Sequence, residues 1–215
     1  MKKIAVLSFA ALAFSGFASA SLIPTFQTVV GTTYTYTAAL DSNEQLNNSL
    51  ALNGNTCQSS PVGGGTTLTT APCGQFFTLF DIPSTPASAL TATAPVGTWT
   101  TSIQLIGNKN VLTGLAIPDS AGFNNVTFTY IGPTLVGSAA TTALGPFTIT
   151  APGTVLGSNN IAFAFNTAHN PDTTFADQGA GVVSGPMAGV PEPGSMLLIG
   201  GGLVGLALLR RKLVS

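Results

Sequence analysis

The sequence predicts an all-β protein whose single body domain folds as an antiparallel β-sandwich or a jelly-roll-like domain. First, β-branched and aromatic residues alternate with polar ones over short stretches, which is typical of strands with one buried face. Second, glycine, proline and asparagine separate these stretches, as they do in many-stranded sandwiches. Third, no stretch of the body repeats its apolar residues with the 3.6-residue period of a long helix.

Six stretches carry the strand pattern: residues 32–40, 74–82, 98–106, 125–132, 146–150 and 161–166. In the third stretch, one face is expected to hold Trp99, Thr101, Ile103 and Leu105, and in the fourth, Val126, Phe128 and Tyr130. Residues 42–45 fit the capping box of a short helix, but the asparagines that follow favour a loop.

The composition is typical of an exported domain that is poor in charge. Of 215 residues, 45% are apolar and 6% are charged, against about 25% charged in an average soluble protein. Disordered chains combine low hydrophobicity with high net charge, so a folded core is expected. Lys109 is the one basic residue between residues 4 and 209, whereas nucleic-acid binding needs clustered Lys and Arg. No nucleic-acid partner is expected.

Residues 1–20 have the pattern of a signal peptide. Lys2 and Lys3 precede an apolar run over residues 4–14, and Ala18 and Ala20 form the small-residue site that signal peptidase cleaves. The mature chain is therefore expected to begin at Ser21, and the body to occupy residues 21–188. The alternative, a buried N-terminal helix, explains neither the lysines nor the small residues.

Residues 189–215 form a distinct tail. Its apolar run extends from Met196 to Leu209, and 17 residues counted from Pro193 would make about 25 Å of helix, slightly less than a bilayer core of about 30 Å. We expect a weak membrane-spanning helix over residues 194–209. The basic cluster that follows should stay in the cytoplasm, which leaves the body outside; it consists of Arg210, Arg211 and Lys212.

Two prolines precede this run and prevent a helix from continuing back into the body, so Glu192 is expected to be extended and accessible. The order Val190-Pro191-Glu192-Pro193, a Gly- and Leu-rich span and a basic end resembles the PEP-CTERM sorting tail. The resemblance implies processing by an exosortase, a membrane cysteine peptidase of Gram-negative bacteria that make exopolysaccharide. It further implies an inner-membrane-anchored precursor whose body is delivered to the cell surface or extracellular matrix. A permanent single-span anchor is the alternative.

Cys57 and Cys73 are the two cysteines of the chain, and in an exported protein such a pair predicts a disulfide. Closing a loop of about 15 residues would stabilise the fold by about 3 kcal/mol in the chain-entropy model. Two cysteines and a distant histidine do not make a zinc site, so no metal is expected there.

His169 is the single histidine, and Asp172 and Asp177 follow it closely. A calcium site would need more oxygen ligands at tight spacing, and a catalytic base would need a nucleophile and an orienting partner. Asn, Asp and Pro of such segments mostly form turns, so a structural loop is favoured over calcium binding or catalysis. We expect neither catalytic residues nor a cofactor.

The favoured function is that of a non-enzymatic surface or matrix protein associated with exopolysaccharide. The alternative is a displayed binding module for carbohydrate or, with less support, for ice. Trp99, Tyr34 and Tyr36 are candidate sugar-binding aromatics, although a core position is favoured for each. Ice binding would want evenly repeated threonines, and the chain has no fixed period. A glycosidase would need two facing carboxylates, which the sequence does not pair.

Overall fold

The computed structural model describes residues 22–48, 56–59, 69–72, 74–84, 86–107, 109–110, 119–120, 122–138, 142–169 and 176–189. These residues form antiparallel strands and one short 3-10 turn, η1 (Ala87–Ala89), so the all-β prediction is confirmed. Within these ranges, no helix has the length and apolar character needed to cross a membrane. The helices predicted over residues 1–20 and 194–209 lie outside the described residues.

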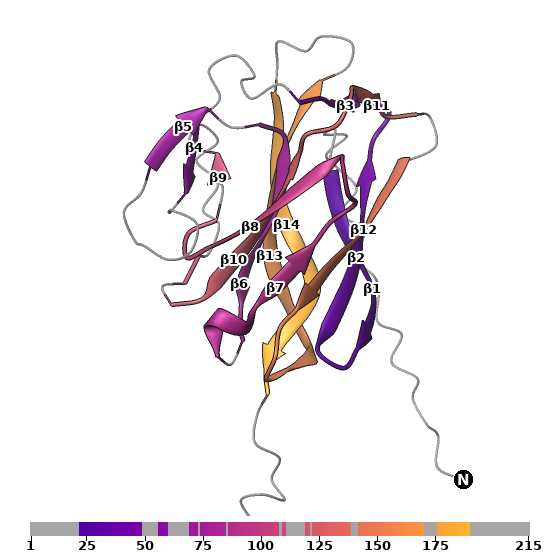
Figure 1. Ribbon diagram of the computed structural model, residues 1–215. Helices are drawn as coiled ribbons and strands as arrows, with labels where there is room; N and C mark the ends of the chain where they lie inside the picture. The colour runs from indigo at the N-terminus through magenta and orange to yellow at the C-terminus, as the bar shows by residue number, and fades with distance from the viewer. Residues whose placement is uncertain are drawn as a thin grey trace, which may run out of the picture.

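Two larger sheets form the body (Figure 1). The first has the order β1-β2-β12-β7 and consists of β1 (Leu22–Val30), β2 (Thr33–Leu40), β12 (Thr142–Thr150) and β7 (Thr91–Thr93). The second has the order β11-β3-β13-β6-β10-β8 and consists of β11 (Leu135–Val136), β3 (Glu44–Leu46), β13 (Thr154–His169), β6 (Phe76–Ile82), β10 (Asn124–Tyr130) and β8 (Trp99–Gln104).

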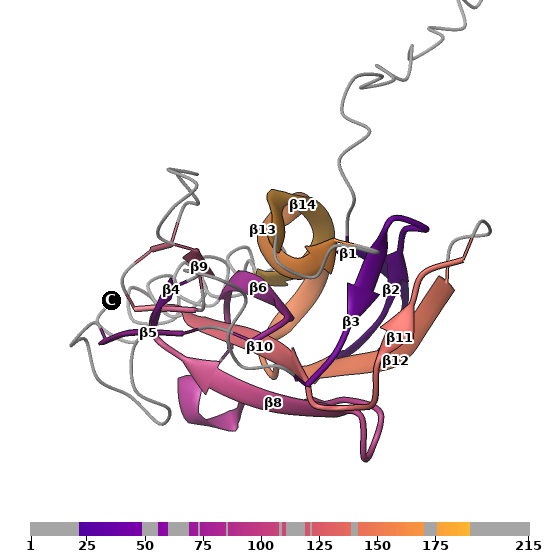
Figure 2. The same cartoon turned by 90° about the horizontal axis from the view of Figure 1, so that it is seen from above.

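Two additions extend this arrangement. The long strand β14 (Ala176–Ala188) pairs with one edge of β13, while β3 and β6 follow each other along the other edge. A small third sheet of order β5-β4-β9 lies to one side of the body (Figure 2). Its strands are β5 (Thr69–Pro72), β4 (Thr56–Ser59) and β9 (Lys109–Asn110).

All six predicted strands are present, as β2, β6, β8, β10, β12 and β13, although β12 and β13 are longer than predicted. The short-helix alternative for residues 42–45 is wrong. The Glu44 N–H donates to the Asp41 carbonyl at 3.1 Å to close a turn, and β3 begins there. The Glu44 carbonyl then accepts from the Gly137 N–H at 2.8 Å, so pairing with a distant segment satisfies this backbone.

The two larger sheets share one core in which Phe147 of β12 is central. Its ring centroid lies 4.9 Å from that of Phe77, 5.0 Å from that of Trp99 and 5.1 Å from that of Phe128. Those three residues belong to β6, β8 and β10 of the opposite sheet. Such edge-to-face aromatic pairs add about 0.5–1.5 kcal/mol each beyond the burial of their area. Phe147 therefore links the two sheets directly.

Strand β2 shows the alternation that the sequence predicts. Tyr34 and Tyr36 are fully buried, and the threonines that alternate with them point away from the core. The two phenols differ in their environment: the Tyr34 hydroxyl lies 3.0 Å from the Thr154 Oγ1, whereas the Tyr36 hydroxyl has no hydrogen-bond partner. Burial, with a smaller contribution from Tyr34, raises the pKa of Tyr36 well above its ordinary value.

The expectation of a single buried face is wrong for β6 and β10, which are buried on both faces. On the second face, Thr78 and Thr127 are fully buried and their hydroxyls lie 2.8 Å apart. Gly107 packs closely over Thr78, because a Cβ at that position would lie 2.6 Å from the Thr78 Cγ2. One of the two hydroxyls donates to the other, so each has a hydrogen-bond partner, as polar groups removed from water require.

Strand β8 keeps the predicted face, because Trp99, Thr101 and Ile103 are the register partners of the core residues Tyr130, Phe128 and Val126. Trp99 is buried and Ile103 packs against the core, but Thr101 between them is exposed. The side chains of Val126, Phe128 and Tyr130 share the core face as predicted. Thr101 lies beside Phe128 on this face, and it remains exposed to water because β8 is the last strand in the order of its sheet.

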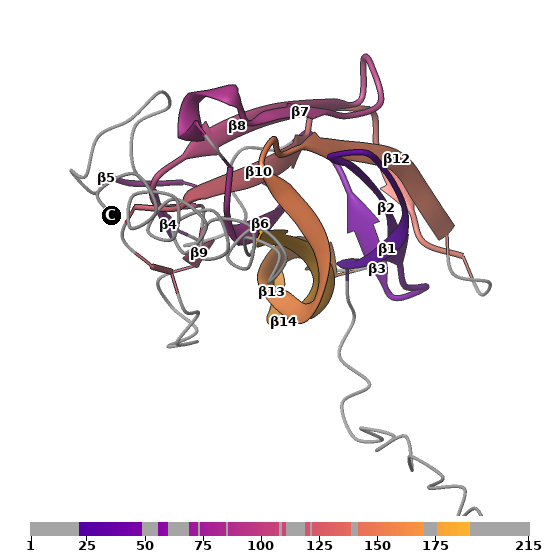
Figure 3. The ribbon, with the colours of Figure 1, turned by 90° about the horizontal axis from the view of Figure 1, so that it is seen from below.

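Strands β13 and β14 form a long ribbon that curls strongly around its own axis (Figures 2 and 3). Glycines of β14 accept large side chains of β13 over their backbone: a Cβ at Gly179 would lie 2.5 Å from the Phe165 ring, and a Cβ at Gly181 would lie 2.7 Å from the Phe163 ring. Aromatic rings that cover glycines on a neighbouring strand are a recognised device for pinning strand register. These rings also belong to the shared core.

Cys57 lies in β4, is 5% exposed and packs against Phe76 in a small cluster of its own. Cys73 directly follows β5, the neighbour of β4, but it lies outside the described residues. The pairing of the two cysteines stays a prediction.

Thiol labelling of the unfolded, unreduced protein should find no free cysteine, and reduction should expose two. Full labelling before reduction would rule out the disulfide.

The contrasting environments of two tyrosines predict opposite effects of removing their hydroxyls. Tyr34→Phe should lower the free energy of unfolding by about 1 kcal/mol, because it deletes a buried hydrogen bond to Thr154. Tyr36→Phe should leave stability unchanged or raise it, because it removes a buried hydroxyl that has no partner. Urea unfolding of both variants measures the difference, and equal losses would contradict this assignment.

Gly181→Ala should destabilise the body by about 1–3 kcal/mol, since the new methyl group would overlap the Phe163 ring and force it to move. An alanine in an ordinary strand position would instead favour folding over glycine. Ala180→Ser, at the neighbouring exposed position, is the matched control and should have little effect. Urea unfolding decides the question, and unchanged stability of Gly181→Ala would show that the ring does not cover this glycine.

Candidate functional site

The segments with predicted sorting roles lie at the ends of the chain, outside the described residues. They include the sorting motif, the basic cluster and the signal cleavage site: Val190, Pro191, Glu192, Pro193, Arg210, Arg211, Lys212, Ala18, Ala20 and Ser21. The described body shows where the tail leaves it. This exit, the hollows beside the core and the outer faces of the sheets are the places where function can reside.

The tail leaves from the surface of a complete fold. Strand β14 ends at Ala188, and the Gly189 N–H donates to the Gly153 carbonyl at 3.2 Å. Both Ala188 and Gly189 are exposed. The last strand is therefore finished before the first residue of the motif, and the chain emerges next to the start of β13.

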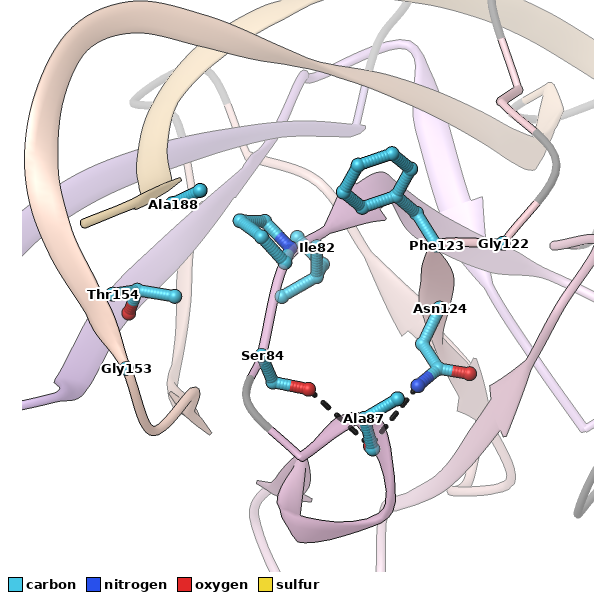
Figure 4. A pocket seen from close by; sticks show the side chains of 10 residues that line it. Ile82, Ser84, Ala87, Gly122, Phe123, Asn124, Gly153, Thr154 and Ala188 are labelled. Atoms are coloured by element: carbon cyan, nitrogen blue, oxygen red, sulfur yellow. Dashed lines mark hydrogen bonds between the residues drawn. The ribbon is translucent and has the colours of Figure 1, made fainter. Parts of the chain in front are cut away.

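A small hollow of about 150 Å³ lies beside this exit (Figure 4). Ile82, Phe123, Thr154 and Ala188 are among its lining residues, and none of the ten is titratable. Two side chains that project toward it are already engaged: Ser84 Oγ and Asn124 Nδ2 both donate to the Ala87 carbonyl, at 3.2 and 3.1 Å. The hollow is smaller than the 300 Å³ or so of a typical ligand pocket and offers no acid–base group.

A larger hollow of about 370 Å³ opens near Trp99 and Tyr130, at the junction of β8, β10 and β12. Both aromatic side chains are nearly buried, at 6% and 5% exposure, and the Tyr130 hydroxyl donates to the Pro133 carbonyl at 2.6 Å. Burial raises the pKa of Tyr130. Since Tyr34 and Tyr36 are also buried, the three aromatic residues considered for sugar stacking belong to the core, as favoured from the sequence.

His169 and Asp177 lie on the paired strands β13 and β14, where Thr167 is the register partner of Asp177. Asp172 lies outside the described residues. In the part of the chain that the structure describes, no three His, Cys, Asp or Glu side chains gather as a metal site would require.

Asp81 and Asp119 are both bonded to Asn125 near the end of β6, and both hold a loop. Asp81, at φ 56°, accepts from the Ser120 N–H at 2.7 Å and from its hydroxyl at 2.9 Å. Asn125 Nδ2 donates to the Asp119 Oδ1 at 3.1 Å, while its Oδ1 accepts from the Asp81 N–H at 2.8 Å. The two carboxylates therefore accept hydrogen bonds that connect residues 119–120 to β6 and β10.

The outer face of the β1-β2-β12-β7 sheet carries an array of threonines that was not predicted from the sequence. Thr35 has Thr28 of β1 and Thr148 of β12 as its register partners, and Thr148 in turn pairs with Thr93 of β7. We call the array the threonine face; its members are Thr25, Thr28, Thr33, Thr35, Thr37, Thr91, Thr93, Thr148 and Thr150. All are partly or fully exposed.

The threonine face consists of cross-strand rows. The row Thr28–Thr35–Thr148–Thr93 crosses all four strands, the row Thr33–Thr150–Thr91 crosses three, and Thr25 pairs with Thr37. The available sequence signal was Thr-x-Thr, which occurs at 33–35–37, 91–93 and 148–150. Only the strand order brings these separate segments together, because β2, β12 and β7 are far apart in the chain.

Comparison with protein families identifies the tail. A family model described as the PEP-CTERM protein-sorting motif matches residues 189–212, which begin at the residue after β14. No curated protein and no solved structure matches the chain. The match covers the Pro-Glu-Pro segment, the apolar run and the basic cluster recognised in the sequence. The chain is therefore a protein that carries the PEP-CTERM sorting motif.

Proposed function

We propose that the chain is an exported, non-enzymatic protein of the cell surface or extracellular matrix, delivered there through its C-terminal tail and associated with exopolysaccharide. The observation that carries this proposal is the PEP-CTERM sorting motif over residues 189–212. That motif implies export, sorting at the membrane and processing by an exosortase. The absence of enzymatic activity is proposed from the composition, which supplies seven acidic residues and one histidine in 215.

The position of the motif relative to the fold supports a tail that is removed. Strand β14 is complete at Ala188, and Gly189 is held by its bond to Gly153. Cleavage at or beyond the Pro-Glu-Pro segment would therefore leave every described strand in place. The body would retain its core and its outer faces after release.

The sequence of the tail supports a temporary membrane stage. Its apolar run is short for a bilayer core and contains several glycines, so it holds the membrane weakly. Arg210, Arg211 and Lys212 would remain in the cytoplasm and set the orientation of the precursor. The Pro-Glu-Pro segment would then lie on the outer side of the membrane, where the two prolines keep Glu192 extended for a peptidase.

Glu192→Ala should block processing, because it removes the carboxylate between the two prolines. The expected result is a larger species that stays in the inner membrane, while the unmodified chain loses its tail and leaves that fraction. Ser195→Ala, three residues along, is the matched control and should be processed normally. Membrane fractionation with intact-mass measurement checks both variants. If the unmodified chain keeps residues 210–212, and Glu192→Ala alters neither mass nor location, the tail is a permanent anchor.

A second candidate, a displayed module that binds carbohydrate, is favoured by one observation, the threonine face. The face supplies hydroxyl and methyl groups on the outside of a sheet whose inner side is fixed by the core. Ice, the other ligand considered from the sequence, has less support because adjacent strands of a sheet are rotated by about 20–25° and the array is not flat over four strands.

A further inference from the structure

The threonine face presents a regular pattern of groups. Adjacent strands lie about 4.8 Å apart, and alternate residues of one strand about 6.8 Å apart, so the rows form a two-dimensional array. Hydrogen bonds within the rows fix several hydroxyls: Thr33 Oγ1 lies 3.0 Å from Thr150 Oγ1, and Thr93 and Thr148 are bonded in the same way. Gln27 Nε2 donates to Thr37 Oγ1 at 2.9 Å.

These contacts pre-organise the face for a ligand. In each threonine pair one O–H is the donor, so the second O–H and the remaining lone pairs are available to an outside partner. The β-branched side chain is restricted at χ1, which lowers the entropy lost when a ligand binds. Each residue also offers a methyl group beside its hydroxyl. A partner that alternates hydroxyl groups with C–H surfaces fits this chemistry.

The charge of the threonine face and of the body around it determines which class of polysaccharide can bind. Strands β1, β2, β7 and β12 contain no charged residue, so the face has no cation to pair with an acidic polymer. Elsewhere the body is acidic: Lys109 is its one basic residue, against six aspartates and glutamates between residues 22 and 189. An anionic polysaccharide would be repelled, and a neutral one would not.

The shape of the face indicates a long ligand rather than a small one. None of the nine threonines lines either hollow described above. A small molecule on an open sheet would bury too little of its surface, whereas a polymer can contact several rows at once. We propose that the threonine face binds an uncharged polysaccharide chain, laid across β1, β2, β12 and β7. This assignment rests on the proposed function, since it requires a body displayed among surface glycans.

The test uses the mature protein purified from the cell envelope, with amorphous cellulose as the neutral probe and alginate as the acidic one. The test variant replaces both members of the two bonded pairs, with Thr33→Val, Thr150→Val, Thr93→Val and Thr148→Val. Valine keeps the shape and the strand preference of threonine, and replacing both partners of a hydroxyl pair costs little stability. The matched control is Thr100→Val with Thr101→Val, two exposed threonines of β8 on the other sheet.

We expect the unmodified protein and the control to sediment with cellulose and not to bind alginate. The fourfold valine variant should lose at least about tenfold in affinity while urea unfolding shows an intact fold. Equal binding by the variant would overturn the proposal, as would equal binding to alginate.

Two other occupants of the face are outcomes of the same experiment. If the unmodified protein inhibits ice recrystallisation and does not bind cellulose, and the valine variant has lost that inhibition, the face binds ice and the proposal is overturned. If light scattering shows that the unmodified protein is a dimer that does not bind cellulose, and that the valine variant is a monomer, the face binds a second copy of the chain and the proposal is overturned. Tail removal in each variant is measured separately by intact mass, so loss of glycan binding with normal processing rejects this inference alone.

Discussion

The contact between Phe147 and the aromatic cluster of the opposite sheet is the interaction on which the body depends. Phe147 belongs to β12, and the rings around it belong to β6, β8 and β10. Among the residues that the structure describes, no hydrogen-bond ladder joins the two larger sheets, and side-chain packing holds them together. A sandwich of this kind gains most of its stability from such interdigitated inner faces.

The same contact determines what the outside of the protein presents. Side chains alternate along a strand, so burying Phe147 and Ile149 directs Thr148 and Thr150 outward. Burial of Tyr34 and Tyr36 does the same for the threonines of β2. A one-residue slip of β12 against β2 would expose the aromatic rings and bury hydroxyls, which specifies the register strongly. The threonine rows are thus a consequence of core packing, and their alignment across four strands is as well defined as the core.

Local patterns were sufficient to predict the strands that have one apolar face. Thr-Tyr alternation predicted β2, and Val126, Phe128 and Tyr130 predicted the core face of β10. The double burial of β6 and β10 could not be predicted in this way, because it depends on a distant loop at Gly107 and on paired hydroxyls. The Gly-rich strand β14 was also missed, since its glycines weaken every strand signal until Phe163 and Phe165 cover them.

The candidate sites also differ in whether the sequence alone could predict them. A sorting motif is linear, so Val190 to Pro193 and the basic cluster were recognisable from residue order, and the family match confirms the motif. The threonine face is assembled from three separate segments, and only strand order places Thr35, Thr148 and Thr93 in one row. The aromatic residues considered for sugar binding were correctly favoured as core, because a body of this size needs large side chains inside.

The proposed function requires that the β body is released from a tail that serves only in sorting. Peptide mapping of the protein recovered from the cell surface and medium tests this most directly. We predict a chain that begins at Ser21, retains β14 through Ala188 and lacks Arg210, Arg211 and Lys212. Recovery of surface protein with those three basic residues still attached, or with its N-terminus at Met1, would contradict the account.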